Sequence, residues 1–189
     1  MNKLTTPARR PATYQDVIDA PADKIAEIVR GALYLHPRPL PRHSRAMISL
    51  GGQINSPFGV GQGGPGGWWI LIEPELHLRD DVLVPDLVGW RRERLPALPD
   101  TVGIAVVPDW VCEVLSPRTR RFDLTEKRAS YAGHGVQFLW LVDPQARTLA
   151  ACRLVDGTWT VLTTIRDSAE VRLPPFEAVG FPLSTLWTD

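Results

Sequence analysis

The stretch 109–116, DWVCEVLS, places a glutamate in the middle of an otherwise apolar run. Side chains of a β-strand point alternately to its two faces. The even-numbered residues Trp110, Cys112 and Val114 therefore share one face, and the odd-numbered residues, Glu113 among them, share the other. Both faces are apolar, which predicts an interior strand covered on both sides. An ionised carboxylate in that position costs several kcal/mol unless a partner compensates its charge.

A second acid interrupts a second apolar stretch, VLVPDLVGW at residues 82–90. Asp86 lies in the middle of this predicted strand, on the same face as Val84 and Val88. One such acid would be explained by a hydrogen-bonded structural carboxylate or by a different strand register. Two neighbouring carboxylates without a cation repel each other, and one of them is forced to bind a proton. A divalent cation between Asp86 and Glu113 resolves both problems, and oxygen ligands without soft donors favour Mg²⁺ or Mn²⁺.

A lysine that can reach the two acids lies in the next predicted helix, which begins near residue 119 and ends at Gly133 or Gly135. Only three of the 21 Lys and Arg residues are lysines, and Lys127 is the one in the core of the chain. Asp123 and Lys127 are four residues apart and share a helix face, so an exposed ion pair is one interpretation. In the other interpretation the helix packs back on the sheet and Lys127 leans over the carboxylates.

Local patterns outside these stretches predict an α/β fold. Strand and turn signals indicate hairpins over 24–37 and 148–164, the second with Asp156-Gly157 at its turn. The remaining expected elements are helices over 13–20 and 41–59, strands over 67–78, 81–90, 106–115 and 136–144, and a short closing helix near the C-terminus. This order of elements predicts a mixed β-sheet flanked by helices.

Length and composition are those of a single globular domain. The chain has 189 residues, 44% apolar and 22% charged, so we expect a flexible segment over 1–12 and one domain over 13–189. The formal net charge is zero, which gives no global electrostatic signature of a nucleic-acid binder. No apolar run approaches the roughly 20 residues of a membrane span, and the N-terminus lacks the apolar region of a secretory signal. With Cys112 and Cys152 interpreted as buried thiols, we expect a cytoplasmic protein without membrane partners.

Three familiar motifs are disfavoured by their context. GQGGPG at 61–66 has the spacing of a dinucleotide-binding loop, but it precedes a predicted strand where that site needs a helix. Ser116 follows a strand without the G-x-S-x-G turn of a hydrolase nucleophile, and a helix-start role explains it better. The four histidines and two cysteines show no zinc-ligand spacing.

The two acid-bearing stretches also carry a family resemblance. VPDLVGW at 84–90, followed by PDWVCEVLSPRTRRFDLTEKRASYAGHGVQFLWLVDP at 108–144, closely resembles the Uma2 family, also called DUF820. The resemblance extends from YQDV at 14–17 to STLW at 184–187, nearly the whole chain. Members of this family are predicted endonucleases of the PD-(D/E)XK type. The resemblance implies a restriction-endonuclease-like mixed sheet flanked by helices, with the N-terminal and C-terminal hairpins as additions.

The resemblance assigns roles to the two acids and the lysine. Asp86 matches the aspartate of the PD element, and Glu113 matches the glutamate of the E-x-K element. The third position of that element is Leu115, so the role of its lysine passes to Lys127 on the helix. The resemblance also implies supporting residues, which are Glu27, His43 and Asp123.

These residues together imply a metal-dependent endonuclease that hydrolyses phosphodiester bonds of nucleic acid, with DNA as the expected partner. Asp86, Glu113 and the backbone carbonyl of Val114 would hold Mg²⁺ or Mn²⁺, which activates water and stabilises charge on the phosphate. Lys127 would position the attacking water or neutralise charge, and as a base it would need a pKa lowered by burial. Arginines near the ends of the acid-bearing strands would contact backbone phosphates. They are Arg91, Arg92, Arg94, Arg118, Arg120 and Arg121.

The alternative function belongs to a different class of protein. A nuclease-like fold can serve as a non-catalytic module that binds nucleic acid or a protein partner, and the lack of surplus positive charge favours that interpretation. The buried pair of acids favours the enzyme, because a binding module does not need one. Nucleases that cut two strands often act as dimers, and the apolar strands and seven tryptophans are compatible with a homodimer.

Overall fold

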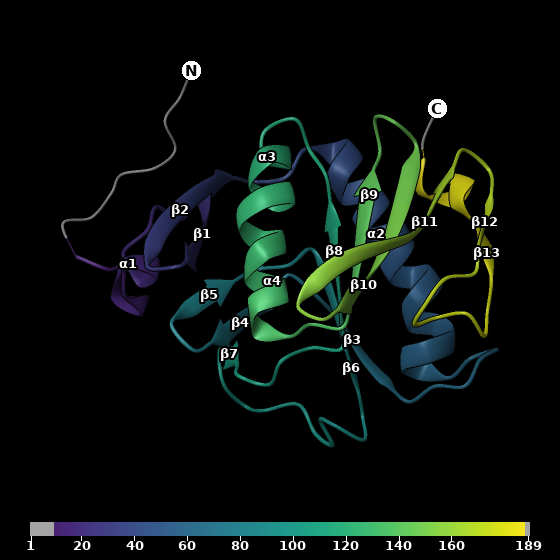
Figure 1. Ribbon diagram of the computed structural model, residues 1–189, viewed down its shortest axis with the longest axis horizontal. Helices are drawn as coiled ribbons and strands as arrows, with labels where there is room; N and C mark the ends of the chain where they lie inside the picture. The colour runs from purple at the N-terminus through teal and green to yellow at the C-terminus, as the bar shows by residue number, and fades with distance from the viewer. Residues whose placement is uncertain (1–9, 188–189) are drawn as a thin grey trace.

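Residues 10–187 are described by a computed structural model, in which two mixed sheets combine with helices (Figure 1). The six-stranded sheet has the spatial order β11 (Thr158–Arg166), β10 (Thr148–Val155), β9 (Phe138–Asp143), β8 (Trp110–Val114), β6 (Leu87–Arg91) and β3 (Trp68–Ile72). The five-stranded sheet has the order β2 (Ala32–Pro37), β1 (Lys24–Val29), β5 (Asp81–Leu83), β4 (Glu75–Leu78) and β7 (Gly103–Ile104). A short ribbon joins β12 (Glu170–Val171) to β13 (Phe181–Pro182). The predicted flexible segment falls mostly on residues 1–9, which lie outside the described residues, so the division at residue 12 stays a prediction.

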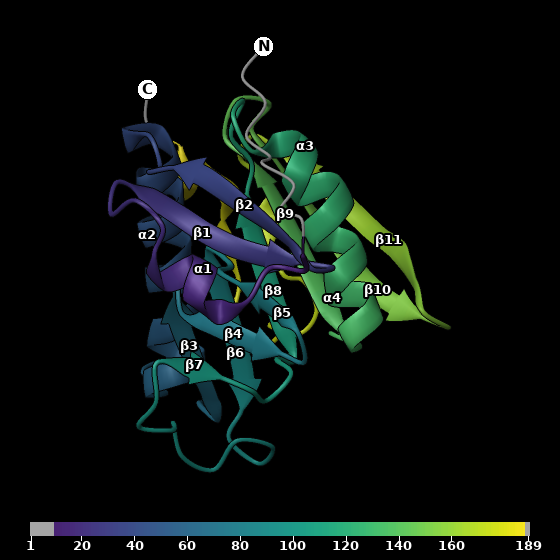
Figure 2. The same cartoon turned by 90° about the vertical axis from the view of Figure 1, so that its left-hand side faces the viewer.

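The helices cover the faces of the larger sheet and one end of the hairpin (Figures 1 and 2). They are α1 (Tyr14–Ile18), α2 (Pro41–Ile54), α3 (Arg120–Phe122) and α4 (Arg128–His134). Two π-helical segments, η1 (Asn55–Val60) and η2 (Asp123–Lys127), and the 3₁₀ turn η3 (Leu183–Leu186) complete the set. The predicted α/β class, with a mixed sheet flanked by helices, is confirmed.

Strand β8 lies in the interior of the six-stranded sheet, antiparallel to β6 and parallel to β9. All five of its residues are buried. Trp110 and Cys112 belong to a core cluster with residues of α2 and η3, whereas Val111 belongs to a second cluster with residues of α4 and the smaller sheet. The alternation expected from the sequence is therefore confirmed, and Glu113 points to the second face, where it contacts Tyr131.

One helical rod, formed by α3, η2 and α4, connects β8 to β9 and covers the second face of the sheet (Figure 1). It ends where Gly135 adopts a φ of 82°, a left-handed conformation that glycine takes at little cost. Tyr131 and Val136 are fully buried in the core beneath the rod. Residues one turn apart on its inner side therefore face β8.

Residues 81–90 do not form one strand, which corrects the prediction made from their apolar pattern. β5 ends at Leu83 and pairs within the five-stranded sheet, whereas β6 begins at Leu87 in the six-stranded sheet. Pro85 has no N–H to donate to a strand ladder, so a ladder is interrupted there. Asp86 consequently lies at the junction of the two sheets and not in the middle of a strand.

The β1–β2 hairpin lies beside the rod (Figure 2). The rings of Tyr34 and His36 contact the ring of Phe122 at centroid distances of 4.6 Å and 4.4 Å. These contacts hold the hairpin over the junction of the sheets, where it forms one wall of the pocket described below.

Asp81 joins the hairpin to the rod by three hydrogen bonds. It accepts hydrogen bonds from the backbone N–H of Arg30 at 2.7 Å, from Ser130 Oγ at 2.6 Å and from His134 Nε2 at 2.9 Å. Burial alone would raise the pKa of Asp81, but these hydrogen bonds outweigh it and the pKa is lowered. Asp81 is therefore an ionised link between β5, the hairpin turn and α4.

The second hairpin, β10–β11, turns at Asp156 and Gly157, as predicted. Both residues have positive φ, 48° and 73°, which suits the tight turns that match the twist of the strands. Cys112 and Cys152 are both buried and free. Within residues 10–187, every helix is too short or too polar to span a bilayer.

Candidate active site

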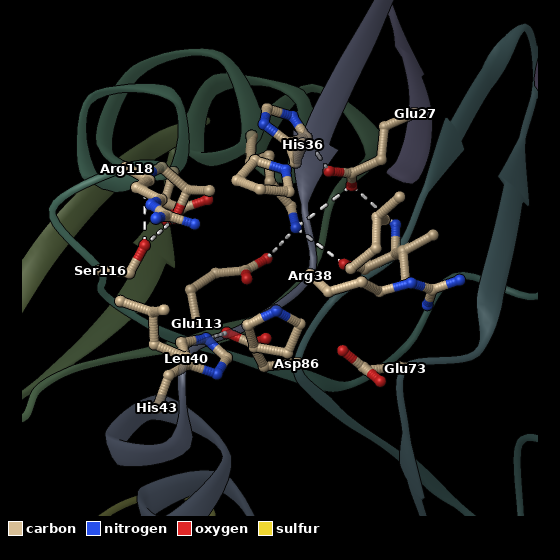
Figure 3. Close-up of a pocket in the computed structure, with 17 residues that line it drawn as sticks. Glu27, His36, Arg38, Leu40, His43, Glu73, Asp86, Glu113, Ser116 and Arg118 are labelled. Atoms are coloured by element: carbon tan, nitrogen blue, oxygen red, sulfur yellow. Dashed lines mark hydrogen bonds and ion pairs between the residues drawn. The ribbon is translucent and has the colours of Figure 1, made fainter. Parts of the chain in front are cut away.

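A pocket with a cavity volume of about 50 Å³ lies where the β1–β2 hairpin, the start of α2 and the connection from β8 to α3 meet (Figure 3). This volume has room for a few water molecules. All six side chains predicted to be catalytic or supporting line it: Glu27, His43, Asp86, Glu113, Asp123 and Lys127. The tertiary structure therefore brings the predicted site residues together, although they come from four different helices and strands and the connection between β5 and β6.

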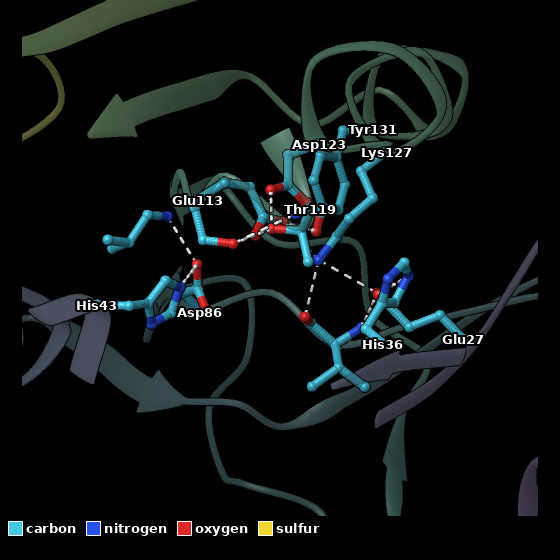
Figure 4. Close-up of polar contacts among 12 residues, drawn as sticks. Glu27, His36, His43, Asp86, Glu113, Thr119, Asp123, Lys127 and Tyr131 are labelled. Carbon is cyan, nitrogen blue, oxygen red and sulfur yellow. Dashed lines mark hydrogen bonds and ion pairs between the residues drawn. The ribbon is translucent and has the colours of Figure 1, made fainter. Parts of the chain in front are cut away.

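Asp86 is fixed from two sides. Its Oδ2 accepts a hydrogen bond of 2.6 Å from the backbone N–H of Val114 and lies 3.1 Å from His43 Nε2 (Figure 4). Burial alone would lower the pKa of His43, but the hydrogen bond and the charge of Asp86 outweigh it and the pKa is raised. His43, predicted as a supporting residue, thus holds Asp86 by donating a charge-assisted hydrogen bond.

Glu113 has the partners that its burial requires. Its side chain is only 3% exposed, and Oε1 accepts a hydrogen bond of 2.6 Å from the Tyr131 hydroxyl and lies 2.8 Å from Lys127 Nζ (Figure 4). Burial raises the pKa of Glu113 well above its usual value, the charge of Lys127 lowers it, and the nearby carboxylates raise it again. The buried glutamate in the opening stretch therefore faces a lysine and a tyrosine.

Lys127 lines the pocket, and its Nζ has three close oxygen partners. Nζ lies 2.8 Å from Glu113 Oε1, 3.2 Å from Glu27 Oε1 and 2.8 Å from the Val84 carbonyl. Burial alone would lower the pKa of Lys127, but Glu113 and Glu27 outweigh it and the pKa is raised well above its usual value. Lys127 therefore remains protonated, and the lowered pKa that a base would need is absent.

Asp123 is buried in the same pocket, so the interpretation of Asp123 and Lys127 as an exposed ion pair is wrong. The two residues are 5% and 3% exposed, and the close partners of Lys127 are elsewhere. Oδ2 of Asp123 accepts a hydrogen bond of 2.8 Å from Thr119 Oγ1. Burial raises the pKa of Asp123 to about 7, although Lys127 and Thr119 lower it. Asp123 is thus a carboxyl group that can exchange a proton near neutral pH.

Glu27 connects the hairpin to the site. Its Oε1 accepts a hydrogen bond of 2.7 Å from the backbone N–H of Val84 in addition to the contact with Lys127. Its Oε2 lies 3.5 Å from His36 Nε2. Burial lowers the pKa of His36, partly offset by the charge of Glu27. The hairpin therefore contributes a buried carboxylate that orients Lys127.

Two acids of the pocket carry oxygen atoms of the kind that magnesium accepts as ligands. In the part of the chain that the structure describes, Oδ1 of Asp86 and Oε2 of Glu113 have no hydrogen-bond or ion-pair partner, so each acid has one oxygen available. The N–H and C=O of a strand residue point to the same edge, so the carbonyl of Val114 is directed to the edge where its N–H meets Asp86. Within residues 10–187, no three His, Cys, Asp or Glu side chains cluster around a common metal position. Magnesium commonly takes one or two carboxylates and completes its shell with water.

The predicted phosphate-contacting arginines divide into two groups. Arg118 is exposed and lines the pocket, and Arg120 and Arg121 are exposed on the first turn of the rod. Arg120 forms an ion pair with Asp143. Of these three arginines, only Arg118 lines the pocket.

The other predicted arginines lie away from the pocket. Arg91 is the last residue of β6, whereas Asp86 precedes its first residue. The guanidinium groups of Arg91 and Arg92 lie over the rings of Trp68 and Trp69, at 4.7 Å and 4.0 Å. Arg94 forms a 2.9 Å ion pair with Asp109. The structure does not bring this group to the site.

Two pocket residues, His36 and Glu73, were not assigned a role from the sequence, and neither was Tyr131, which contacts Glu113 without lining the pocket. Tyr131 lies four residues after Lys127, so the helical period could have placed it on the same face. His36 and Glu73 line the pocket from β2 and from the end of β3. Neither has a local signal, because each reaches the pocket only through the packing of the two sheets.

Comparison with known proteins gives a family and a fold. A family model described as "Uma2: Putative restriction endonuclease" matches residues 11–185. The crystal structure of a "putative nuclease belonging to DUF820" from Anabaena variabilis ATCC 29413 is similar, with a TM-score of 0.72 and 24% sequence identity. The similarity covers 93% of this chain and 97% of that chain, and at this identity it establishes the shared fold. No curated protein matches the chain.

Proposed function

Because the chain belongs to the Uma2 family, we propose that it is a magnesium-dependent endonuclease that hydrolyses phosphodiester bonds of nucleic acid. The observation that carries this proposal is the convergence of Asp86, Glu113 and Lys127 on one pocket, where one oxygen of each acid has no partner among residues 10–187. A structural ion pair between Glu113 and Lys127 would not require a second acid to face the same space.

Asp86 and Glu113 would bind the metal through Oδ1 and Oε2, and the Val114 carbonyl would complete the protein ligands. A divalent ion bound there would lower the pKa of water and stabilise the charge that develops on the phosphate. His43 holds Asp86, and Tyr131 and Lys127 hold Glu113, so each acid is oriented before the metal binds. Such fixed ligands reduce the cost of reorganising the site during reaction.

Lys127 acts as a fixed positive charge in this proposal. It balances Glu113 and Glu27 in the buried wall of the pocket and adds positive potential near the position of the phosphate. Its three contacts also connect the hairpin, β8 and the β5–β6 connection, so it holds the pocket in shape.

DNA is the proposed partner, with Arg118 as the contact to the phosphate backbone closest to the metal ligands. Arg118 is exposed at the pocket, whereas the net charge of the chain is zero. Binding should therefore depend on local contacts and fall with rising salt. A cytoplasmic homodimer, in which two such sites cut two strands, is part of the same proposal.

Metal binding is the first test. Calorimetric titration with Mn²⁺ and Mg²⁺ should show binding to the wild-type protein and a loss of affinity of at least about tenfold in Glu113→Gln, since even indirect contacts of a metal site contribute that much. Glutamine keeps the shape of the side chain. Glu93→Gln, an exposed glutamate outside the pocket, is the matched control and should bind like wild type.

Cleavage is the second test. Plasmid DNA, single-stranded DNA and RNA are incubated with the protein and Mg²⁺ or Mn²⁺, with EDTA as the control. Metal-dependent cleavage that is lost in Glu113→Gln but kept in Glu93→Gln supports the proposal. Binding of nucleic acid without metal binding or cleavage would instead identify a non-catalytic module with a nuclease-like fold.

A further inference from the structure

The reaction needs a group that accepts the proton of the attacking water, and Lys127 is unsuited to this role. Its Nζ donates a hydrogen bond to the Val84 carbonyl at 2.8 Å and lies 2.8 Å from Glu113 Oε1 and 3.2 Å from Glu27 Oε1. The two carboxylates keep it protonated, as its raised pKa indicates. A proton acceptor must therefore come from another side chain of the same pocket.

Asp123 has the position of such an acceptor. It lines the pocket from η2 and is 5% exposed. Thr119 Oγ1 donates to Oδ2, and Thr119 is itself held by Ser116 through contacts of 3.0 Å and 3.2 Å. Among residues 10–187, Oδ1 has no partner and is available to a molecule in the pocket. One oxygen is thus fixed and the other is free, as a base that must be oriented requires.

The surroundings of Asp123 make it a better base than an exposed aspartate. The charged and titratable groups around it are Lys127 on the same rod, Glu113 on β8, Asp86 between β5 and β6, Glu27 on β1 and His43 on α2. Burial and the carboxylates raise the pKa of Asp123 to about 7, against the opposing effects of Lys127 and Thr119. A base is most effective when its pKa is close to the working pH.

We propose that Asp123 is a catalytic residue, the general base that accepts the proton of the attacking water, and this inference rests on the proposed nuclease function. The water oxygen forms its bond to phosphorus with the electron pair of the O–H bond, and the proton passes to Oδ1 of Asp123. The bond from phosphorus to the leaving oxygen breaks with its electron pair. The leaving oxygen takes a proton from solvent, and Asp123 later returns its proton to solvent.

Asp123→Asn tests the role directly, because asparagine keeps an oxygen that can accept the hydrogen bond from Thr119. We expect kcat on labelled single-stranded and duplex DNA oligonucleotides to fall by about 10²–10⁴-fold, with KM, Mn²⁺ affinity and Tm close to wild type. Glu126→Gln, a half-buried glutamate of the same rod outside the pocket, is the matched control and should keep full activity.

Thr119→Val supplies an independent readout. The hydrogen bond from Thr119 lowers the pKa of Asp123, so its removal should raise that pKa and move the acid limb of the kcat/KM profile to higher pH. A carbon NMR titration of the Asp123 carboxyl in metal-free protein should move in the same direction, without any need for activity. The matched control is Thr125→Val, at an exposed threonine of the same rod. It should change neither the pH profile of kcat/KM nor the NMR titration of Asp123.

The outcomes separate this inference from the proposed function. If the wild-type protein cleaves no nucleic acid with Mg²⁺ or Mn²⁺, the proposed function fails and the inference fails with it. If the wild type cleaves and Asp123→Asn retains its kcat, the inference alone is overturned. The inference alone is also overturned if Thr119→Val shifts the NMR titration of Asp123 but leaves the pH profile of cleavage unchanged.

Discussion

Lys127 Nζ lies 2.8 Å from Glu113 Oε1, and both side chains are almost completely buried, at 4% and 3% exposure. The lysine comes from the helical rod and the glutamate from the central strand of the large sheet. Glu27 on the hairpin shares the same lysine at 3.2 Å. One cation therefore balances two buried carboxylates from two different sheets, and the stability of the fold depends on the chemistry of the pocket.

Lys127→Met should destabilise the protein strongly at neutral pH. Methionine has a similar length but no charge, so Glu113 and Glu27 would stay buried without a cation, at a cost of about 3–5 kcal/mol in the free energy of unfolding. The pKa of Glu113 is already raised by burial and would rise further. Because the folded variant would bind protons more readily than the unfolded chain, its deficit should shrink as the pH falls. Urea denaturation near pH 7 and pH 5 measures both effects.

Lys24→Met is the control for this prediction. Lys24 pairs with Asp23 at 3.0 Å, but the two side chains are 34% and 72% exposed. Its loss should cost less than about 1 kcal/mol, as for most surface pairs. Equal losses in the free energy of unfolding of the two variants would show that the burial of Lys127 with Glu113 and Glu27 is unimportant for stability.

Tyr131→Phe should lower the free energy of unfolding by about 2 kcal/mol, because the hydroxyl that donates to buried Glu113 at 2.6 Å is removed. The pKa of Tyr131 is raised well above its usual value by burial and by Glu113, so the hydroxyl is a donor throughout the neutral range. Tyr14→Phe removes a similar bond, to Glu75 at 2.9 Å, in a more exposed place. Chemical denaturation should give the smaller loss in the free energy of unfolding for Tyr14→Phe. The reverse order would contradict a stabilising role for the buried hydrogen bond between Tyr131 and Glu113.

His43→Leu should weaken metal binding much more than it weakens the fold. The imidazole holds Asp86 at 3.1 Å, and loss of such an indirect contact typically lowers metal affinity by about 10–100-fold. The Nδ1 atom of His43 is buried without a partner among residues 10–187. Its removal should offset part of the cost of the lost hydrogen bond to Asp86, so the fall in Tm should be small. Calorimetry with Mn²⁺ and a thermal melt in EDTA measure the two effects. His77→Leu, a histidine outside the pocket that pairs with Glu75, should bind metal like wild type.

Asp81→Ala should separate the hairpin from the helical rod. Three hydrogen bonds are lost, from the Arg30 N–H, Ser130 and His134, and a loss of about 2–3 kcal/mol is expected. The pKa of Asp81 is lowered in the folded protein, so its contribution is present above the usual aspartate pKa. This contribution to stability should disappear as the pH falls through the lowered pKa of Asp81. Tm measured from pH 7 downwards should show the gap to wild type closing, while the exposed neighbour variant Asp80→Ala stays at wild-type Tm throughout.

Local signals were sufficient for most of the elements. The helix that carries Lys127 ends at Gly135, and the last hairpin turns at Asp156-Gly157, as their sequences indicate. The alternation of apolar residues around Glu113 gave the correct faces of β8. These features depend on neighbours within a few residues, so a single sequence contains the information.

The main errors in the fold were two places where the chain changes sheets. The predicted strand over 67–78 divides into β3 and β4 of different sheets, and the predicted strand over 81–90 divides next to Asp86. Its apolar neighbours predicted one strand over 81–90, but the chain changes sheets at Pro85. The same pattern of residues is compatible with one long strand or with two short strands in different sheets. Only the pairing of β5 with β4 and of β6 with β8 decides between them.

The amino-acid pattern was enough to predict two buried acids in an α/β fold, with Lys127 as a possible compensating charge, because the cost of a buried charge does not depend on the details of packing. The remaining contacts follow from the packing of the folded chain: three acceptors around Lys127, Thr119 beside Asp123, and Arg91 and Arg92 away from the pocket. Such contacts join atoms that are far apart in the chain. They are set by how the two sheets and the helical rod pack against one another, which a local pattern does not encode.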